Sequence, residues 1–387
     1  MTTIGVAVIG MGLMGGLHSR ALIDAPTRFP EIDARPRLVV CADENQERAE
    51  EAKSRFGFER STSDWQEAAL AEDVDIVFIC TPNQSHLEIA AAASAAGKHV
   101  FCEKPVGRAP EDTRAIADAV RSSGVLGFAG YVYRMPPLVR FARELIHAGQ
   151  IGEVTHYRGR FHVGYARSPS VVHSWRFDKE QAGFGALGDL MSHVADLMHY
   201  LTGPMDSLVS RLHTFVTERP VADEAGSHFS VADSSGRTEP VTNDDTVGIL
   251  GTSASGAQVT LEACRFITGP QCELAFDVHG TNGALSWNFE RMNELRIYED
   301  RPNGSGGWRL VQSGPEHPGH ARFYPGSAVG LGFEDLATLQ AAGMLVALGG
   351  GDIGDVATLA DAVAVAAVQE ACDRSVKSGA WEVVKDE

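Results

Sequence analysis

Asp189 and His193 stand four positions apart in a stretch, residues 185–201, whose apolar residues recur with helical spacing and predict a helix. Helical residues four apart lie on one face, one turn from each other. A carboxylate beside an imidazole holds the ring's orientation and suits it to accept a proton near neutral pH. The pair therefore predicts acid–base chemistry, although surface ion pairs have the same spacing. Asp196 follows near the same face.

A glycine-rich segment near the start of the chain has the spacing that a pyrophosphate requires. It lies between a predicted strand, 4–9, and a predicted helix, 14–22, and reads Gly10, Met11, Gly12, Leu13, Met14, Gly15. In G-x-G-x-x-G the glycines allow a tight turn, close approach of the backbone to phosphate, and close helix–strand packing. The segment predicts nucleotide binding; the alternative is a glycine turn without a ligand.

A carboxylate, Asp43, ends the second predicted strand, 37–42. An acid at that place accepts the ribose hydroxyls of a dinucleotide. A 2′-phosphate would face Asp43 and Glu44 with no adjacent arginine, so we expect NAD rather than NADP. Asp43 lies further from the glycines than usual, and we ascribe the difference to an inserted loop at 24–36. Asp43 could instead cap the helix predicted at 45–55, and the two roles could coexist.

Polar groups follow two further predicted strands, 76–80 and 99–102. After the first come residues that suit either a nicotinamide ribose or an ordinary turn and cap: Thr81, Pro82, Asn83 and His86. Glu103 and Lys104 follow the second strand, before a proline. The carboxyl ends of parallel strands form the ligand crevice of such a sheet. We therefore expect Glu103 and Lys104 to serve that crevice; the alternative is a solvated charge pair.

The predicted secondary-structure pattern that must position these residues changes along the chain. Strands alternate with helices up to residue 130, which predicts an NAD-binding Rossmann domain, 1–130, with a doubly wound parallel sheet. Beyond it, strands follow one another without helices, which predicts a mainly antiparallel open sheet in an α+β domain, 131–387. Closing helices are predicted at 332–348 and 355–377, and loops at 217–243 and 302–307. The fold class is α/β.

These motifs together resemble the Gfo/Idh/MocA family, named after glucose–fructose oxidoreductase, inositol dehydrogenase and a rhizopine-catabolism protein. The resemblance runs along nearly the whole chain and is carried by G-x-G-x-x-G, T-P-N-x-x-H, E-K-P, residues 131–134, Trp175-Arg176 and residues 183–193. Residues 57–65, 174–177 and the His317-Pro318 loop resemble its levoglucosan dehydrogenase-like and glycoside-3-oxidising branch. The substrate within that branch stays open.

The resemblance implies an NAD-dependent dehydrogenase of an unphosphorylated sugar, anhydrosugar, cyclitol or glycoside, with ring carbon 3 as one candidate position. It implies that Lys104, Asp189 and His193 surround the reacting carbinol. We assign His193 as the proton acceptor, Asp189 as its partner and Lys104 as the group that stabilises the alkoxide; spacing leaves open whether His193 or Lys104 takes the proton. By family position the substrate cleft is lined by Tyr133, Arg134, Trp175 and Arg176.

One predicted strand, 153–163, carries basic side chains at every second position: His156, Arg158, Arg160 and His162. They must share one face of the sheet. That face is either wet or intersubunit, which favours a homodimer or homotetramer, or it meets the substrate, and Arg158 would then bind it. The histidines lack zinc-like spacing with cysteine or acid, so we expect no metal.

Composition narrows the partners. The 387 residues include 33 Lys and Arg against 51 Asp and Glu, a net charge of −18, which makes nucleic acid and membrane surfaces poor partners. The opening residues lack a basic segment typical of a signal peptide. Six cysteines form no C-x-x-C pair, so we expect a cytoplasmic protein. Two other functions stay open: an NAD-dependent glycosidase acting by transient oxidation and elimination, and a non-catalytic nucleotide-sensing regulator.

Overall fold

The computed structural model describes residues 2–221, 230–231, 236–301 and 304–385. Parts of the predicted loops at 217–243 and 302–307 lie outside these residues. The chain divides into two compact units, which differ from the predicted division at residue 130. Unit 1 comprises Met1–Gly107, Glu111–Pro136 and Gly314–Val363; unit 2 comprises Arg108–Pro110, Pro137–Ser313 and Ala364–Glu387.

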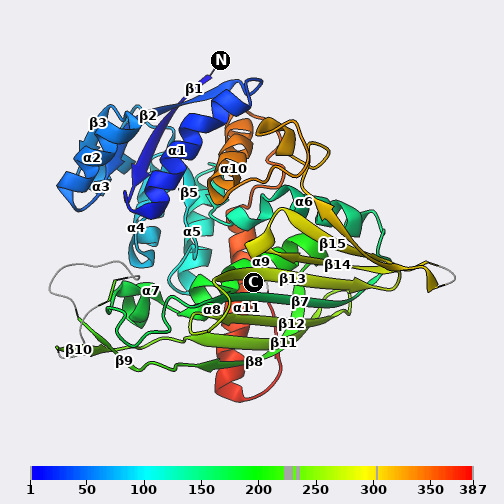
Figure 1. Cartoon of the computed structure of the whole chain (residues 1–387). Coiled ribbons are helices and arrows are strands. Elements are labelled where there is room, and N and C mark those ends of the chain that lie inside the picture. The colour runs from blue at the N-terminus through cyan, green and yellow to red at the C-terminus, as the bar shows by residue number, and fades with distance from the viewer. Residues whose placement is uncertain (1, 222–229, 232–235, 302–303, 386–387) are drawn as a thin grey trace. The chain divides into compact units, whose positions relative to one another are not determined.

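The sheet of unit 1 has six parallel strands in the order β3-β2-β1-β4-β5-β6 (Figure 1). This order confirms the predicted doubly wound sheet, and it is the strand order of a dinucleotide-binding Rossmann domain. The short strand β3 was not predicted. The strands are β1 (Thr2–Ile9), β2 (Ala34–Ala42), β3 (Arg60–Thr62), β4 (Ile76–Ile79), β5 (His99–Cys102) and β6 (Gly127–Ala129).

Helices connect these strands: α1 (Leu13–Arg28), α2 (Gln46–Phe56), α3 (Trp65–Ala69), α4 (His86–Ala95) and α5 (Pro110–Ser122). The predicted inserted loop at 24–36 is wrong over much of its length, because α1 continues through Pro26 to Arg28 and β2 begins at Ala34. The buried side of the helix extends past Leu22 to Ala25, so its last turn still packs on the core.

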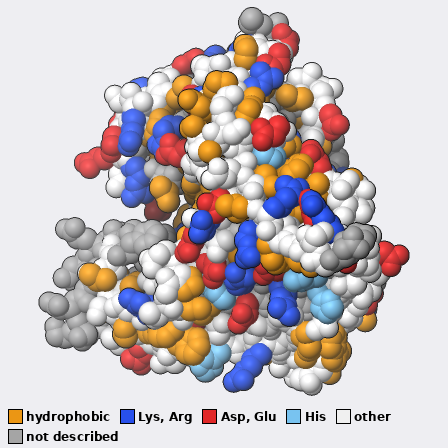
Figure 2. All heavy atoms as spheres, turned by 45° about the vertical axis from the view of Figure 1, so that its right-hand side comes forward, with side chains coloured by type: hydrophobic (Ala, Val, Ile, Leu, Met, Phe, Trp, Pro, Cys, Tyr) orange, Lys and Arg blue, Asp and Glu red, His pale blue; other side chains and the backbone are white. Residues whose placement is uncertain are grey.

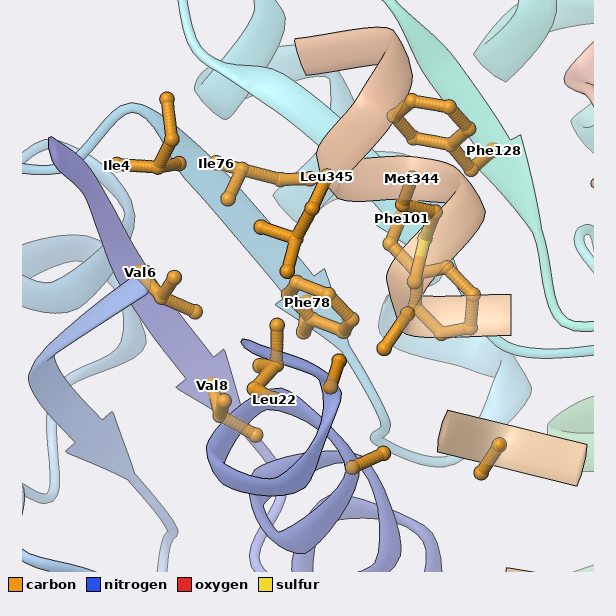
Figure 3. Close-up of a cluster of buried hydrophobic side chains, with 14 of the residues drawn as sticks. Ile4, Val6, Val8, Leu22, Ile76, Phe78, Phe101, Phe128, Met344 and Leu345 are labelled. Atoms are coloured by element: carbon orange, nitrogen blue, oxygen red, sulfur yellow. The ribbon is translucent and has the colours of Figure 1, made fainter. Parts of the chain in front are cut away.

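Helix α10 (Phe333–Leu348) comes from the C-terminal part of the chain but belongs to unit 1. Its Met344 and Leu345 share a buried cluster with Leu22 of α1 and with Phe78 and Phe101 of the sheet (Figure 3). Burial of such side chains contributes about 1.5–3 kcal/mol each. The segment that holds α10 is therefore part of the first core, although sequence order placed it in the second domain.

The sheet of unit 2 has nine strands in the order β16-β15-β14-β13-β7-β12-β11-β8-β17. All neighbours pair antiparallel except β7 and β12, which confirms a mainly antiparallel sheet. The strands are β7 (Val154–Val163), β8 (Met205–His213), β11 (Thr246–Ser253), β12 (Gln258–Cys264), β13 (Cys272–Gly280), β14 (Gly283–Asn288), β15 (Glu294–Glu299), β16 (Gly307–Gln312) and β17 (Glu382–Val383). A separate pair, β9 (Glu218–Pro220) and β10 (Thr238–Pro240), lies within the predicted loop at 217–243.

The helices of unit 2 are α6 (Pro137–His147), α7 (Lys179–Ala182), α8 (Ala186–Asp189), α9 (Met191–Thr202) and the part of α11 (Leu359–Ser378) that begins at Ala364. The single helix predicted at 185–201 is wrong, because the chain breaks into α8 and α9 at Leu190. Helix α9 packs on one face of β7, where a Cβ on Gly159 would lie 2.7 Å from a methyl carbon of Val194.

The opposite face of β7 carries the four predicted basic residues, which confirms that they share one side. His156 and Arg158 are exposed, Arg160 is half-buried and His162 is buried. Arg160 forms ion pairs with Glu273 at 3.0 Å and with Asp277 at 3.2 Å. Figure 2 shows basic, acidic and histidine side chains interspersed over this sheet face. We call it the open face of the sheet.

The described residues contain no helix that is long and apolar enough to span a membrane. All six cysteines are free thiols, at positions 41, 80, 102, 264, 272 and 372.

Candidate active site

The glycine loop joins β1 to α1 and is shaped for close packing. Gly10 has φ +92°, and a Cβ there would lie 2.6 Å from the carbonyl oxygen of Cys80. A Cβ on Gly15 would lie 2.1 Å from the carbonyl oxygen of Gly10. Gly12, in contrast, would place a Cβ in open space, and no side chain caps α1. The loop therefore presents open backbone at a helix N-terminus, which fits a pyrophosphate.

Asp43 lies against this loop, as the motif predicts. Its Oδ2 accepts the N–H of Met11 at 2.8 Å, and its Oδ1 accepts the N–H of Asn45 at 3.0 Å. The cap of α2 is Asn45, whose side chain accepts the N–H of Arg48, so Asp43 is not the capping residue. Asp43 is thus a buried carboxylate at the end of β2, where an acid of a dinucleotide-binding domain can accept ribose hydroxyls.

The expectation that no arginine accompanies Asp43 is wrong. Arg48 Nη1 lies 3.1 Å from Oδ1 and 3.3 Å from Oδ2 of Asp43, while half of its side chain is exposed. The first turn of α2 folds Arg48 back over Asp43, a contact that five residues of separation did not suggest. A guanidinium beside this carboxylate would attract a 2′-phosphate. It would therefore weaken the preference for NAD over NADP that the carboxylate alone would give.

The segment after β4 is held by His86. Nε2 of His86 lies 2.9 Å from the carbonyl oxygen of Thr81, and Nδ1 lies 3.1 Å from that of Val106. Burial lowers the pKa of His86, although both carbonyl oxygens favour the charged form, and the neutral ring has one N–H and donates to one of the two carbonyl oxygens at a time. Its ring links the segments after β4 and β5, which makes it a positioning residue there. Thr81 and Asn83 remain candidates for the nicotinamide ribose.

Glu103 and Lys104 directly follow β5, and a cis peptide bond joins Lys104 to Pro105. Lys104 is half-buried and Glu103 is buried. The Glu103 carboxylate accepts the N–H of Lys104 at 3.0 Å and lies 2.7 Å from Nε2 of His18. The alternative prediction, that Glu103 forms a charge pair with Lys104 in solvent, is therefore wrong for Glu103. His18 was missed, although a lone histidine on the buried side of a predicted helix is a signal.

In unit 2, Asp189 ends α8 and His193 lies in the first turn of α9. The Tyr165 hydroxyl donates to Oδ2 of Asp189 at 3.3 Å. Burial, with the charge of Asp189, raises the pKa of Tyr165, so its hydroxyl stays protonated and remains a donor. His193 is 4% exposed and packs beside Phe161, with ring centroids 5.9 Å apart. A half-buried carboxylate with a fixed donor thus precedes a buried imidazole.

The glycines before Asp189 allow α8 to begin against neighbouring backbone. A Cβ on Gly185 would lie 1.9 Å from the carbonyl oxygen of Asp244, and one on Gly183, at φ +77°, would lie 1.7 Å from that of Arg108. The Asp244 carboxylate accepts the N–H groups of Gly185 and Leu187 at 2.8 and 2.7 Å. Asp244 therefore fixes the start of the helix that carries Asp189.

Two buried arginines hold the segments around Tyr165. Arg219 donates to the carbonyl oxygens of Ser168 and Ala166, and Arg265 forms a buried ion pair with Asp245 at 2.8 Å. Both guanidinium groups stack on Phe177, at 4.2 and 4.7 Å from its ring centre. Burial lowers the pKa of Arg219 to about 10, which leaves it charged at neutral pH. This cluster was not predicted, although the run Asn243-Asp244-Asp245 was a usable signal.

The other residues predicted to bind the substrate differ in burial and in the unit to which they belong. Trp175 and Arg176 are half-buried in unit 2 and stack on each other at 4.3 Å. In unit 1, Arg134 is buried and forms an ion pair with Asp361 at 3.0 Å, and Tyr133 packs near Phe333. Arg158 is exposed on the open face of the sheet, opposite the face on which α9 carries His193. We therefore leave Arg158 out of the candidate site.

The sequence matches two family descriptions. Residues 4–131 match "Oxidoreductase family, NAD-binding Rossmann fold", and residues 139–286 match "GFO/IDH/MocA C-terminal domain". The chain is 37% identical over 387 residues to levoglucosan dehydrogenase of Pseudarthrobacter phenanthrenivorans, an alignment that covers 98% of each chain. It is 27% identical over 295 residues to inositol 2-dehydrogenase of Rhizobium meliloti, covering 76% of this chain and 78% of the relative.

Solved structures show the same similarity to levoglucosan dehydrogenase. Levoglucosan dehydrogenase in complex with NADH and levoglucosan superposes with a TM-score of 0.91 at 35% identity, over 99% of this chain and 100% of the other. The complex with NADH and L-sorbose gives a TM-score of 0.93 at the same identity, over 99% of both chains.

The fold and the NAD-binding domain define an NAD-dependent oxidoreductase. The chain belongs to the Gfo/Idh/MocA family, and its relatives include levoglucosan dehydrogenase and inositol 2-dehydrogenase.

Proposed function

We propose that the chain oxidises a secondary ring hydroxyl of an unphosphorylated sugar, anhydrosugar, cyclitol or glycoside with NAD. The observation that carries the proposal is Asp189, held by the Tyr165 hydroxyl just before the buried His193, in a chain that also places Lys104 after β5. The names of the relatives support this substrate class, since they include dehydrogenases or reductases of levoglucosan, an inositol and an anhydrofructose.

The residues of unit 1 fit the cofactor. The open backbone at Gly12 would hold the pyrophosphate, and Asp43 the adenosine ribose. Thr81 and Asn83 are assigned to the second ribose. When bound, NAD supplies the acceptor for the hydrogen that leaves the carbinol carbon with its electron pair.

The protein must hold the alcohol and remove its proton. A lysine ammonium group only donates hydrogen bonds, whereas a neutral imidazole can accept a proton. We therefore assign the proton to His193 and the stabilisation of the alkoxide oxygen to Lys104. Asp189, which only accepts hydrogen bonds, takes one from a substrate hydroxyl while Tyr165 fixes its position.

Neighbouring hydroxyls on a ring match this set of groups, because each hydroxyl both donates and accepts. A phosphate matches them less well, since Asp189 would repel it and the net charge of −18 would slow its approach. Within the class, the resemblance of residues 57–65 and 174–177 to the glycoside-3-oxidising branch favours ring carbon 3.

The test is a panel of levoglucosan, myo-inositol and a nitrophenyl glucoside, each with NAD and each followed by absorbance of NADH. We expect NADH formation with at least one of them, and a loss of about 10²-fold in kcat on Lys104→Ala with NAD binding retained. Release of nitrophenol without net NADH would indicate the glycosidase instead. Binding of NAD without turnover of any compound in a wider polyol panel would indicate the regulator.

A further inference from the structure

Glu103 is a buried carboxylate whose two oxygens have different partners. It directly follows β5 and is 5% exposed. Its Oε1 lies 2.7 Å from Nε2 of His18, and its Oε2 accepts the backbone N–H of Lys104 at 3.0 Å. One side chain therefore joins α1, the helix that begins at the glycine loop, to the residue assigned to the alkoxide.

The surroundings of His18 are mostly aromatic. The ring is 1% exposed, meets Phe101 edge-on at 4.6 Å and lies 5.8 Å from Phe78. Its Nδ1 is buried and has no hydrogen-bond partner among the described residues. Burying an imidazole and a carboxylate costs desolvation that two apolar side chains of similar volume would avoid. Packing of the core therefore does not explain the pair.

Glu103 carries a charge at neutral pH. Burial alone would raise its pKa, but the hydrogen bond and charge of His18, together with Lys104, outweigh burial and lower it. The thiols of Cys80 and Cys102 and the imidazole of His86 are further titratable groups whose pKa responds to this carboxylate. As an anion, Glu103 accepts hydrogen bonds at both oxygens and attracts the charged Lys104.

Two further contacts restrict the backbone around Lys104. A Cβ on Gly130 would lie 2.8 Å from Oε2 of Glu103, so the chain directly after β6 passes close to the carboxylate. Downstream, Nδ1 of His86 lies 3.1 Å from the carbonyl oxygen of Val106. Lys104 is thus held from both sides, by Glu103 before it and His86 after it.

We propose that His18 and Glu103 are positioning residues, which fix the backbone of Lys104 so that its ammonium group meets the substrate hydroxyl. The inference rests on the proposed function, because it presumes that Lys104 acts on the substrate. His18 and Glu103 act through Lys104, and they tie its position to the helix that begins at the cofactor loop.

Two substitutions at Glu103 separate its hydrogen bonds from its charge. In Glu103→Gln the amide oxygen can accept the N–H of Lys104, and the amide N–H₂ can donate to Nε2 of the other His18 tautomer. Glu103→Ala removes both contacts. We expect Glu103→Ala to lower kcat about tenfold or more, with Glu103→Gln restoring it to within about threefold of the wild type. The Kd for NAD, measured by calorimetry, should stay within about twofold in both.

A third variant tests the other partner of the pair. His18→Phe removes the donor to Glu103 and leaves that carboxylate buried without it, so the thermal midpoint should fall, and kcat, measured well below that midpoint, should fall about tenfold. The matched control is Asp75→Ala. The Asp75 carboxylate also accepts a backbone N–H, that of Gly5 at 2.6 Å, but just before β4, at the amino end of the same sheet. We expect its kcat to remain near that of the wild type.

The deciding comparison adds Glu103→Ala to Lys104→Ala. If Glu103 acts through Lys104, the double variant has the kcat of Lys104→Ala alone. Near-wild-type kcat in both Glu103→Ala and His18→Phe, beside a large loss in Lys104→Ala, would overturn the positioning role and leave the proposed function intact. An additive loss in the double variant would also overturn it. Near-wild-type kcat in Lys104→Ala would instead contradict the proposed function.

Discussion

At the scale of single residues, each carboxylate of the candidate site has a hydrogen-bond donor that fixes its position. Asp43, Glu103 and Asp189 are each fixed by a donor from another segment: Met11, His18 and Tyr165. Such donors keep a carboxylate in place before a ligand arrives, which lowers the cost of binding. The pairings of His18 with Glu103 and of Tyr165 with Asp189 do not follow from sequence spacing, because they join residues 85 and 24 positions apart.

Cofactor preference depends on the pair Asp43 and Arg48. The carboxylate disfavours a 2′-phosphate while the guanidinium attracts it, so we expect NAD to be preferred by about tenfold, or about 1.4 kcal/mol. Asp43→Ala should narrow this preference, and Arg48→Ala should widen it. The ratio of kcat/KM for NAD to that for NADP measures both effects. Equal use of the two cofactors by the wild type would contradict the assignment.

Tyr165 tests the Asp189 site. Tyr165→Phe removes the donor to Asp189 and should lower kcat/KM about tenfold, while the aromatic ring stays in place. Because the pKa of Tyr165 is raised, the deficit should persist at every pH from 6 to 9 rather than vanish at the alkaline end. Tyr157→Phe removes another buried hydroxyl of the same unit and should have little effect on kcat/KM. Equal losses in the two variants would indicate a general packing effect.

At the scale of elements, the sequence predicted the strands and helices that carry strong local patterns. Runs such as residues 76–80 and 99–102 are uniformly apolar, so β4 and β5 were found close to their bounds. The break at Leu190 was missed because it interrupts a helix without a proline or a glycine at that residue. The return of α10 to unit 1 was missed because apolar periodicity shows that a helix is buried but does not show against which core.

The glycine loop allows ligand binding and folding to be separated. Gly12 has an extended backbone and open space where a side chain would lie, so Gly12→Val, although a poorer N-cap, should lower the thermal midpoint less than Gly15→Ala does but raise the Kd for NAD at least about tenfold. Gly15→Ala meets the carbonyl oxygen of Gly10 and should lower the midpoint by several degrees. Calorimetry and a thermal melt measure the two effects. Unchanged NAD affinity in Gly12→Val would contradict the placement of the pyrophosphate.

At the scale of the whole molecule, the open face of the sheet leads to a prediction about assembly. It carries exposed His156 and Arg158 among ion pairs of Arg160 with Glu273 and Asp277. A broad sheet face over which the described part of the chain places no helix layer suits a self-complementary contact. We expect a homodimer or homotetramer by light scattering at micromolar concentration, and a smaller species for Arg158→Glu. A monomeric wild type would contradict this prediction.

The central claim is that the chain oxidises a neutral polyol with NAD. Its most direct test is kcat/KM with NAD for matched pairs, methyl β-glucoside with its 6-phosphate and myo-inositol with its 1-phosphate. Because Asp189 and the net charge of −18 oppose an anion, we predict at least about tenfold higher kcat/KM for the unphosphorylated member of any pair that reacts. A preference for the phosphorylated member would contradict the claim.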